Sequence, residues 1–190
     1  MGSIIKVNEY KDFNNNDIIT SDGAGTITLS SGMNTAVNAA GGNTPAWMAS
    51  LGSNQTITAN GTLTLVENDT VLKDTNSAYT NTAGNYKFTV PSGGDGTYYV
   101  FGSMGLYGGG DNTMKNFFLQ LYKNGSTYGH FNNYYQTTTI RYAATSHSMI
   151  MPDLVAGDYI QLYVAADSTG TTVIYNNTYS TFFGGYKLNT

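Results

Sequence analysis

The sequence predicts an all-β protein folded as an antiparallel sandwich. Aromatic and β-branched residues alternate in short runs that are interrupted by Gly, Pro and Asn-Gly, most clearly over Gly84–Gly125. Asn124 and Gly125 follow the apolar run Phe117–Leu121, and they predict a hairpin because both tolerate the positive φ angles of a tight turn. The sequence has no helical period of any length, and its repeating period is two. These features favour strands and turns over helices.

The composition fits such a domain and excludes some functions. Charged residues are 11% of the 190 residues, whereas 40% are hydrophobic and 13% aromatic, which is enough apolar surface to order the chain. The net charge of −4 and the eight scattered basic residues argue against nucleic-acid binding, because phosphate contacts need clustered Lys and Arg. There is no cysteine, so disulfides and thiolate metal sites are excluded.

The apolar residues are not gathered into a membrane or export segment. No stretch approaches the roughly 20 apolar residues of a membrane span, so we expect no membrane insertion. The first ten residues lack the apolar run of a signal peptide. We therefore expect a protein that is cytoplasmic, or that is assembled in the cytoplasm and exposed later on a particle.

The sequence predicts a division near Asn43, with a short arm over residues 1–43 and a head domain over residues 44–190. The arm holds two weak strand signals, Ser3–Val7 and Gly25–Leu29, separated by polar turns, and has too few apolar residues for a core of its own. Two interpretations stay open. The segment is a partly flexible leader, or it is an attachment arm that becomes ordered on a partner.

The head is predicted to form about eight to ten short strands, as is usual for all-β domains of this size. The eleven candidate segments for these strands are Ala46–Leu51, Gln55–Thr58, Thr62–Val66, Val71–Lys73, Tyr86–Val90, Gly96–Gly105, Asn116–Lys123, Thr137–Met151, Asp158–Ala165, Val173–Tyr175 and Phe182–Leu188.

Several pieces of the head, taken in order, resemble the globular head of complement C1q and its tumour-necrosis-factor relatives. They are Val71–Asp74, Tyr79, Gly84–Pro91, Gly96–Phe101, Leu119–Gly125, Leu154–Leu162 and Phe183–Leu188. The sequence departs from the family pattern at two places. Gly84 lies further from Phe88 than the corresponding Gly and Phe of the family pattern, and Gly93–Asp95 lengthens the following turn. The resemblance implies a ten-stranded jelly roll whose heads pack side by side into a threefold homotrimer.

Five aromatic residues are candidates for the core or the trimer contact. Trp47, the only Trp, is predicted to anchor the core or an interface and not to stack on a ligand. Tyr98, Phe101, Tyr159 and Tyr186 are expected to supply apolar faces, either between the sheets or between protomers. The sequence does not decide which face each residue takes.

No combination of residues predicts catalysis. His130 and His147 are the only histidines, and no nucleophile elbow, paired-histidine motif or phosphate loop accompanies them. Gly108–Asp111 lacks a Lys and a following helix, so a flexible loop is favoured over a phosphate cradle. The aspartates fall mostly near turns, where solvated side chains are favoured over a calcium site. We expect no enzyme activity, no cofactor and no metal.

The Tyr- and Asn-rich segment Tyr128–Gln136 is the best candidate for a contact loop. Tyr gives a large amphipathic contact area at low entropic cost, and Asn adds hydrogen bonds. Such a surface suits a glycan, with rings stacked on sugar faces and amides bound to hydroxyls. A loop packed against the neighbouring subunit is an equal alternative. The candidate binding residues are Tyr128, His130, Phe131, Asn133, Tyr134 and Tyr135.

Together with the resemblance, these features are similar to those of proteins carried on bacteriophage particles. The arm would bind a capsid or tail protein. The head would face outward from the virion surface as a capsid decoration, head fibre or tail fibre tip, with a host surface glycan as a possible ligand. The alternative is a lectin-like adhesion protein of the same fold on a bacterial surface or spore coat, which would be extracellular. A cytokine-like ligand is disfavoured by the missing signal sequence.

Overall fold

The structure is a computed structural model in which the contacts divide the chain between Gly42 and Asn43 into two compact units. The residues that it describes are 9–24, 26–33, 42–57, 61–109, 113–134, 138–177 and 180–188.

The first unit contains a small antiparallel sheet. Its strands are β1 (Glu9–Lys11), β2 (Asp17–Ser21) and β3 (Ile27–Leu29), in the order β1-β2-β3. Only β3 falls within an expected strand, and the expected strand Ser3–Val7 lies outside the described residues. No described residue of this unit belongs to the apolar core.

Two aspartates hold the turns of this small sheet. Asp12 Oδ1 accepts hydrogen bonds from the backbone N–H groups of Asn14 and Asn16, at 2.8 and 2.9 Å. Asp22 Oδ1 does the same for Ala24 and Thr26, at 2.7 and 3.0 Å. Hydrogen bonds to the charged form lower the pKa of both carboxyl groups. Polar turn residues therefore order this unit locally, through side-chain to backbone contacts.

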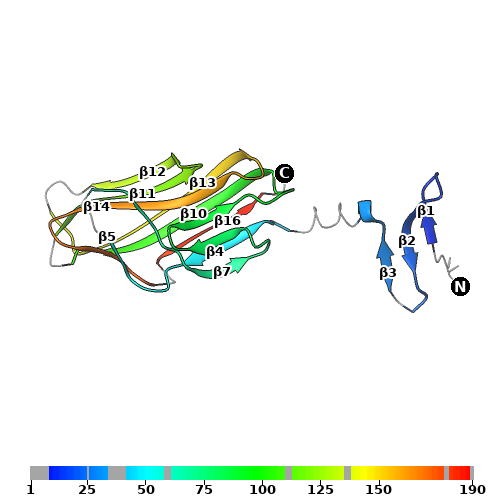
Figure 1. The fold of residues 1–190 in the computed structure, drawn as a ribbon, viewed down its shortest axis with the longest axis horizontal. Coiled ribbons are helices and arrows are strands. Elements are labelled where there is room, and N and C mark those ends of the chain that lie inside the picture. The colour runs from blue at the N-terminus through cyan, green and yellow to red at the C-terminus, as the bar shows by residue number, and fades with distance from the viewer. Residues whose placement is uncertain are drawn as a thin grey trace, which may run out of the picture. The chain divides into compact units, whose positions relative to one another are not determined.

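The second unit, the head, is an antiparallel sandwich of two sheets (Figure 1). Within the described residues, a seven-stranded sheet has the order β5-β15-β10-β16-β4-β7, with β13 paired to β10. A six-stranded sheet has the order β12-β11-β14-β9-β8, with β6 paired to β14. We call them the β10 sheet and the β11 sheet. The strands are β4 (Ala46–Ser50), β5 (Gln55–Ile57), β6 (Thr64–Leu65), β7 (Thr70–Asp74), β8 (Tyr79–Thr82), β9 (Asn85–Thr89), β10 (Gly96–Tyr107), β11 (Met114–Lys123), β12 (Ser126–Tyr134), β13 (Tyr142–Leu154), β14 (Tyr159–Ser168), β15 (Thr172–Ile174) and β16 (Phe182–Lys187).

The predicted fold class, an all-β antiparallel sandwich, is confirmed, and most expected strands are present with shifted ends. The expected strand Thr137–Met151 begins later, at Tyr142, and continues to Leu154. Pro152 lies within β13, at the place where the pairing of β13 with β10 shifts register between Gly96 and Tyr98. A proline is tolerated in a strand at such an irregularity. Two strands of the head were not predicted, β8 and β12. Both contain Asn, which is depleted in strands, and β12 also contains Gly.

The core lies between the two sheets and is centred on aromatic rings. Trp47 of the β10 sheet stacks on Phe88 of the β11 sheet, with ring centroids 3.7 Å apart and planes 4° from parallel. Phe183 and Tyr98 also contact Trp47, at 5.8 and 6.4 Å between centroids. All four side chains are buried, so they join the sheets through burial of large apolar area.

Strand β10 has one row of side chains in the core and one row on the outward surface of its sheet. Its burial alternates: Tyr98 and Val100 point into the core, whereas Tyr99, Phe101 and Tyr107 lie half-buried on the outward side. Burial alternates because successive side chains of a strand point to opposite faces of the sheet. Because β13 and β16 flank β10 on either side, their outward residues lie beside those of β10 and form one face.

Candidate functional site

The expected contact loop is a strand for most of its length, so the loop prediction was wrong there. Residues 126–134 form β12, which pairs with β11 across the turn at Asn124 and Gly125. This strand hydrogen-bonds its backbone to the apolar strand β11, which outweighs the low strand propensity of its Asn and Gly residues. Tyr135 and Gln136 lie outside the described residues.

The β12 residues do not form one surface, because successive side chains of a strand point to opposite sides. His130 lies on the outward side of the β11 sheet, where its Nδ1 is 3.1 Å from Gln120 Nε2. Asn133 turns toward β13 and donates a hydrogen bond to Thr145 Oγ1 at 3.1 Å. Phe131 packs on His147 of β13, with ring centroids 3.3 Å apart. Tyr128 is 39% exposed.

The five candidate anchor residues separate into three groups. Trp47 and Tyr98 are core residues, and burial raises the pKa of Tyr98 to about 12. Phe101 and Tyr186 lie on the outward face of the β10 sheet. Tyr159 lies on the β11 sheet beneath the Lys87 ammonium, which is 4.6 Å from its ring centroid.

The outward face of the β10 sheet carries a row of aromatic side chains, which we call the aromatic face. Tyr99 packs against Tyr186 and Phe101, with centroid distances of 5.5 and 6.0 Å. Phe101 also lies edge-on to Phe182, at 6.0 Å. From Tyr99 to Tyr107, the outward residues of β10 and their partners in β13 and β16 are all uncharged. Ile150 extends this face on β13 and is 57% exposed.

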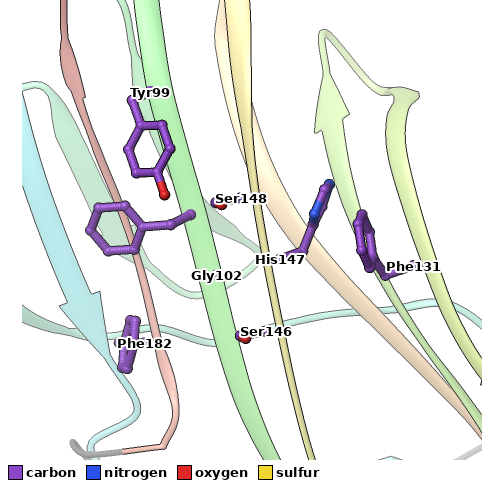
Figure 2. Close-up of a pocket in the computed structure, with 8 residues that line it drawn as sticks. Tyr99, Gly102, Phe131, Ser146, His147, Ser148 and Phe182 are labelled. Atoms are coloured by element: carbon purple, nitrogen blue, oxygen red, sulfur yellow. The ribbon is translucent and has the colours of Figure 1, made fainter.

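A shallow hollow of about 480 Å³ lies on the aromatic face (Figure 2). Figure 2 shows Tyr99 and Phe182 on one side of β10, and His147 and Phe131 on the other side, beyond β13. The hollow is lined by Tyr99, Phe101, Gly102, Phe131, Ser146, His147, Ser148 and Phe182.

His147 brings an unsatisfied polar atom to the rim of this hollow. Its side chain is 8% exposed, and within the described part of the chain its Nε2 has no hydrogen-bond partner. The atom faces β12, because a Cβ at Gly129 would lie 3.1 Å from it. Burial lowers the pKa of His147, since the charged imidazolium loses its hydration there. An unpartnered buried nitrogen is uncommon in native proteins.

An ion pair lies at the end of the β11 sheet where β11 finishes and β14 begins. Lys123 Nζ is 2.9 Å from Asp158 Oδ2, and Asn124 Nδ2 donates to Asp158 Oδ1 at 2.7 Å. These contacts and the backbone N–H of Val155 lower the pKa of the Asp158 carboxyl group. The outward face of the β11 sheet carries polar groups beside its aromatic rings. Gln120 and His130 lie next to Phe118, and the Lys87 ammonium lies over the ring of Tyr159.

A second aromatic group, which we call the tyrosine cluster, lies at one end of the aromatic face. It consists of Tyr107, Tyr142, Tyr175 and Arg141, and sequence reasoning missed all four. Ring centroids of the three tyrosines lie 4.9–6.0 Å apart, with interplanar angles of 10–24°. The signal that points to it in the sequence is Arg141, the only arginine of the chain, directly before Tyr142.

The described residues contain no metal-binding cluster and no membrane-spanning helix. The residues that the structure describes contain no group of three or more His, Asp or Glu side chains that could hold a metal ion. In the same part of the chain, no helix is long and apolar enough to cross a membrane.

Comparison with known proteins identifies the fold. No protein-family model and no curated protein matches the sequence. Among solved structures, murine APRIL at pH 5.0 matches with a TM-score of 0.52 and 12% identity, over 75% of this chain and 98% of that chain. Eiger TNF from S. frugiperda matches with 0.50 and 14%, over 75% and 91%. The globular domain of zebrafish complement 1qA matches with 0.47 and 16%, over 76% and 97%.

The matches to APRIL and Eiger assign the head to the jelly-roll fold of tumour necrosis factor. The predicted resemblance is thereby confirmed at the level of the fold. At such low identity the likeness concerns the arrangement of the strands.

Proposed function

We propose that this protein is a non-enzymatic structural and binding module whose heads assemble as a homotrimer through the aromatic face of the β10 sheet. The observation that carries the proposal is the row formed by Tyr99, Phe101, Phe182 and Tyr186 on an outward sheet surface without charged neighbours. The resemblance to C1q and tumour-necrosis-factor heads supports a threefold assembly.

Elementary energetics supports this use of the aromatic face. Antiparallel sandwiches normally present polar residues outward, and an exposed apolar patch marks an interaction site. Interface cores are enriched in aromatic residues and depleted of charge, which is the composition found around Phe101.

We further propose that the protein is displayed on a bacteriophage particle, as a capsid decoration, head fibre or tail fibre tip. The division of the chain into a small N-terminal unit and a larger head supports this role, together with the Asn-, Thr-, Gly- and Tyr-rich composition. The N-terminal unit would bind a capsid or tail protein, and the head would face outward. The location would then be the virion surface, after assembly in the host cytoplasm.

Two matched substitutions test the proposed trimer contact. Phe101→Asp places a charge in the aromatic face, and we expect it to convert the trimer to monomers, because an unpaired carboxylate is costly in an apolar interface. Phe118→Asp places the same charge on the outward face of the β11 sheet and should leave the trimer intact. Size-exclusion chromatography distinguishes the species. The same oligomeric state in both variants would contradict the proposed contact. Circular dichroism verifies that both variants are folded.

A further inference from the structure

The tyrosine cluster lies at the end of the head opposite to the entry and exit of the chain. At one end of β10, Tyr98 pairs with Lys187, and Tyr186 pairs with Ala46, where the head begins. At the other end of this 12-residue strand, Tyr107 pairs with Tyr142. Figure 1 shows β10 running along the length of the head. If the head is attached through the N-terminal unit, the chain enters the head at one end and the cluster lies at the opposite end.

The cluster is held in a defined geometry by contacts among its own members. Tyr107 and Tyr142 are register partners whose rings lie 24° from parallel, and Tyr175 lies 10° from parallel to Tyr142. A side-chain hydrogen bond with Tyr142 raises the pKa of the Tyr175 hydroxyl. Arg141 Cζ lies 5.3 and 5.2 Å from the ring centroids of Tyr107 and Tyr142, and its Nη2 donates to Tyr107 Oη at 3.3 Å. Little conformational entropy is left to lose when a ligand binds such a group.

The charge of Arg141 separates the cluster from the proposed trimer contact. A guanidinium is always ionised, and charged residues are depleted from the cores of protein interfaces. Arg141 is exposed, and Tyr142 is 55% exposed. The uncharged part of the aromatic face around Phe101 suits contact with a second copy. The charged end suits a polar ligand from solution.

The chemistry of the cluster selects the class of ligand. Tyr rings present apolar faces that can pack on the C–H face of a sugar, and Tyr hydroxyls can bind sugar hydroxyls. The planar fork of Arg141 matches a carboxylate in a bidentate manner. A nucleic acid is a poor fit, because it needs many cations and the chain has a net charge of −4. We propose that Tyr107, Tyr142, Tyr175 and Arg141 bind a carboxylate-bearing saccharide. This inference rests on the proposed role of the head as a binding module and moves its glycan site away from β12.

The test measures binding of the full chain to immobilised polygalacturonate, hyaluronan and polysialic acid by biolayer interferometry. The matched neutral probe is methyl-esterified polygalacturonate, which keeps the sugar backbone and removes the charge. We expect binding to at least one carboxylated polymer and loss of at least about tenfold in affinity in Arg141→Gln and in Tyr142→Ala. Arg141→Lys should also bind more weakly, because an ammonium lacks the bidentate fork. Tyr128→Ala, on β12, should bind as the unchanged protein does.

Three results would overturn the inference. One is the absence of binding to all three carboxylated polymers. Another is equal binding by Arg141→Gln and the unchanged protein, and a third is a loss of binding in Tyr128→Ala alone. Dextran sulfate tests plain charge attraction, and we expect the unchanged protein to bind it more weakly than the carboxylated polymers.

The mass of each variant distinguishes failure of this inference from failure of the proposed function. A trimer that binds no carboxylated polymer contradicts the saccharide site alone. A mass of one chain contradicts the proposed trimer. Binding of that monomer to the polymers would still test the saccharide site at the tyrosine cluster. Because Arg141 is an exposed surface residue, Arg141→Gln tests the site even if Tyr142→Ala proves unstable.

Discussion

Gly185 allows strand β16 to pass close to the ring of Trp47. A methyl group at Gly185 would overlap the Trp47 ring and approach the carbonyl oxygen of Tyr99 to 2.8 Å. Neither neighbour can move easily, because one is the central ring of the core and the other is backbone within β10. The absent side chain at this position is therefore a requirement of core packing.

We expect Gly185→Ala to lower the free energy of unfolding by about 1–3 kcal/mol, as overpacking of a close-packed core commonly does. Urea unfolding at a fixed protein concentration measures the loss. Gly32→Ala is the matched control, since among the described residues no atom lies within 4 Å of the added methyl group. An effect of Gly185→Ala no larger than that of Gly32→Ala would contradict this packing.

His147 couples the stability of the head to pH. Burial lowers its pKa in the folded protein below the ordinary value of 6.5, so the unfolded chain binds the proton more readily. Its contribution to stability is therefore fully present above pH 6.5 and is lost as the pH falls from 6.5 toward the lowered pKa. We expect His147→Gln to lose less stability than the unchanged protein over that window in urea unfolding. Parallel pH profiles of the two proteins would contradict the assignment.

At the scale of elements, the sequence predicted most strands of the head because their signals are local. The alternation of Tyr98 to Phe101 and the turn at Asn124 and Gly125 depend only on neighbouring residues. Strand β12 depends on its partner β11, and a single-segment pattern does not contain that information. Its Asn and Gly residues therefore predicted a loop.

The tyrosine cluster was out of reach of sequence reasoning for a related reason. Tyr107 and Tyr175 are 68 positions apart in the sequence, and pairing of β10 with β13 and β15 brings the cluster together. Register between distant strands decides which residues become neighbours. The aromatic face was partly predictable, because Phe101 and Tyr186 were candidates, but the choice between core and outward side needed the sheet pairing.

The small sheet β1–β3 is the element to which the proposal assigns attachment. We expect removal of residues 1–43 to leave a folded trimer, because no described residue of that segment belongs to the apolar core. The same deletion should abolish co-sedimentation with undecorated phage particles. Loss of trimerisation on deletion would indicate that the segment belongs to the assembled head, and retained co-sedimentation would contradict its role in attachment.

At the scale of the whole molecule, the two sheets of the head have unlike outward surfaces. The outward side of the β11 sheet carries Lys87, Gln120 and His130 among its aromatic rings, and these polar groups are suited to water. The β10 sheet presents the aromatic face, whose exposure to water would be unfavourable. In the proposed assembly, self-association would use the β10 sheet alone and would leave the β11 sheet and the tyrosine cluster on the outside.

The mass of the isolated protein at micromolar concentration tests the central claim most directly. Multi-angle light scattering coupled to size-exclusion chromatography should give about three times the chain mass of 20.4 kDa. A mass of one chain at that concentration would contradict assembly through the aromatic face, and with it the proposed function.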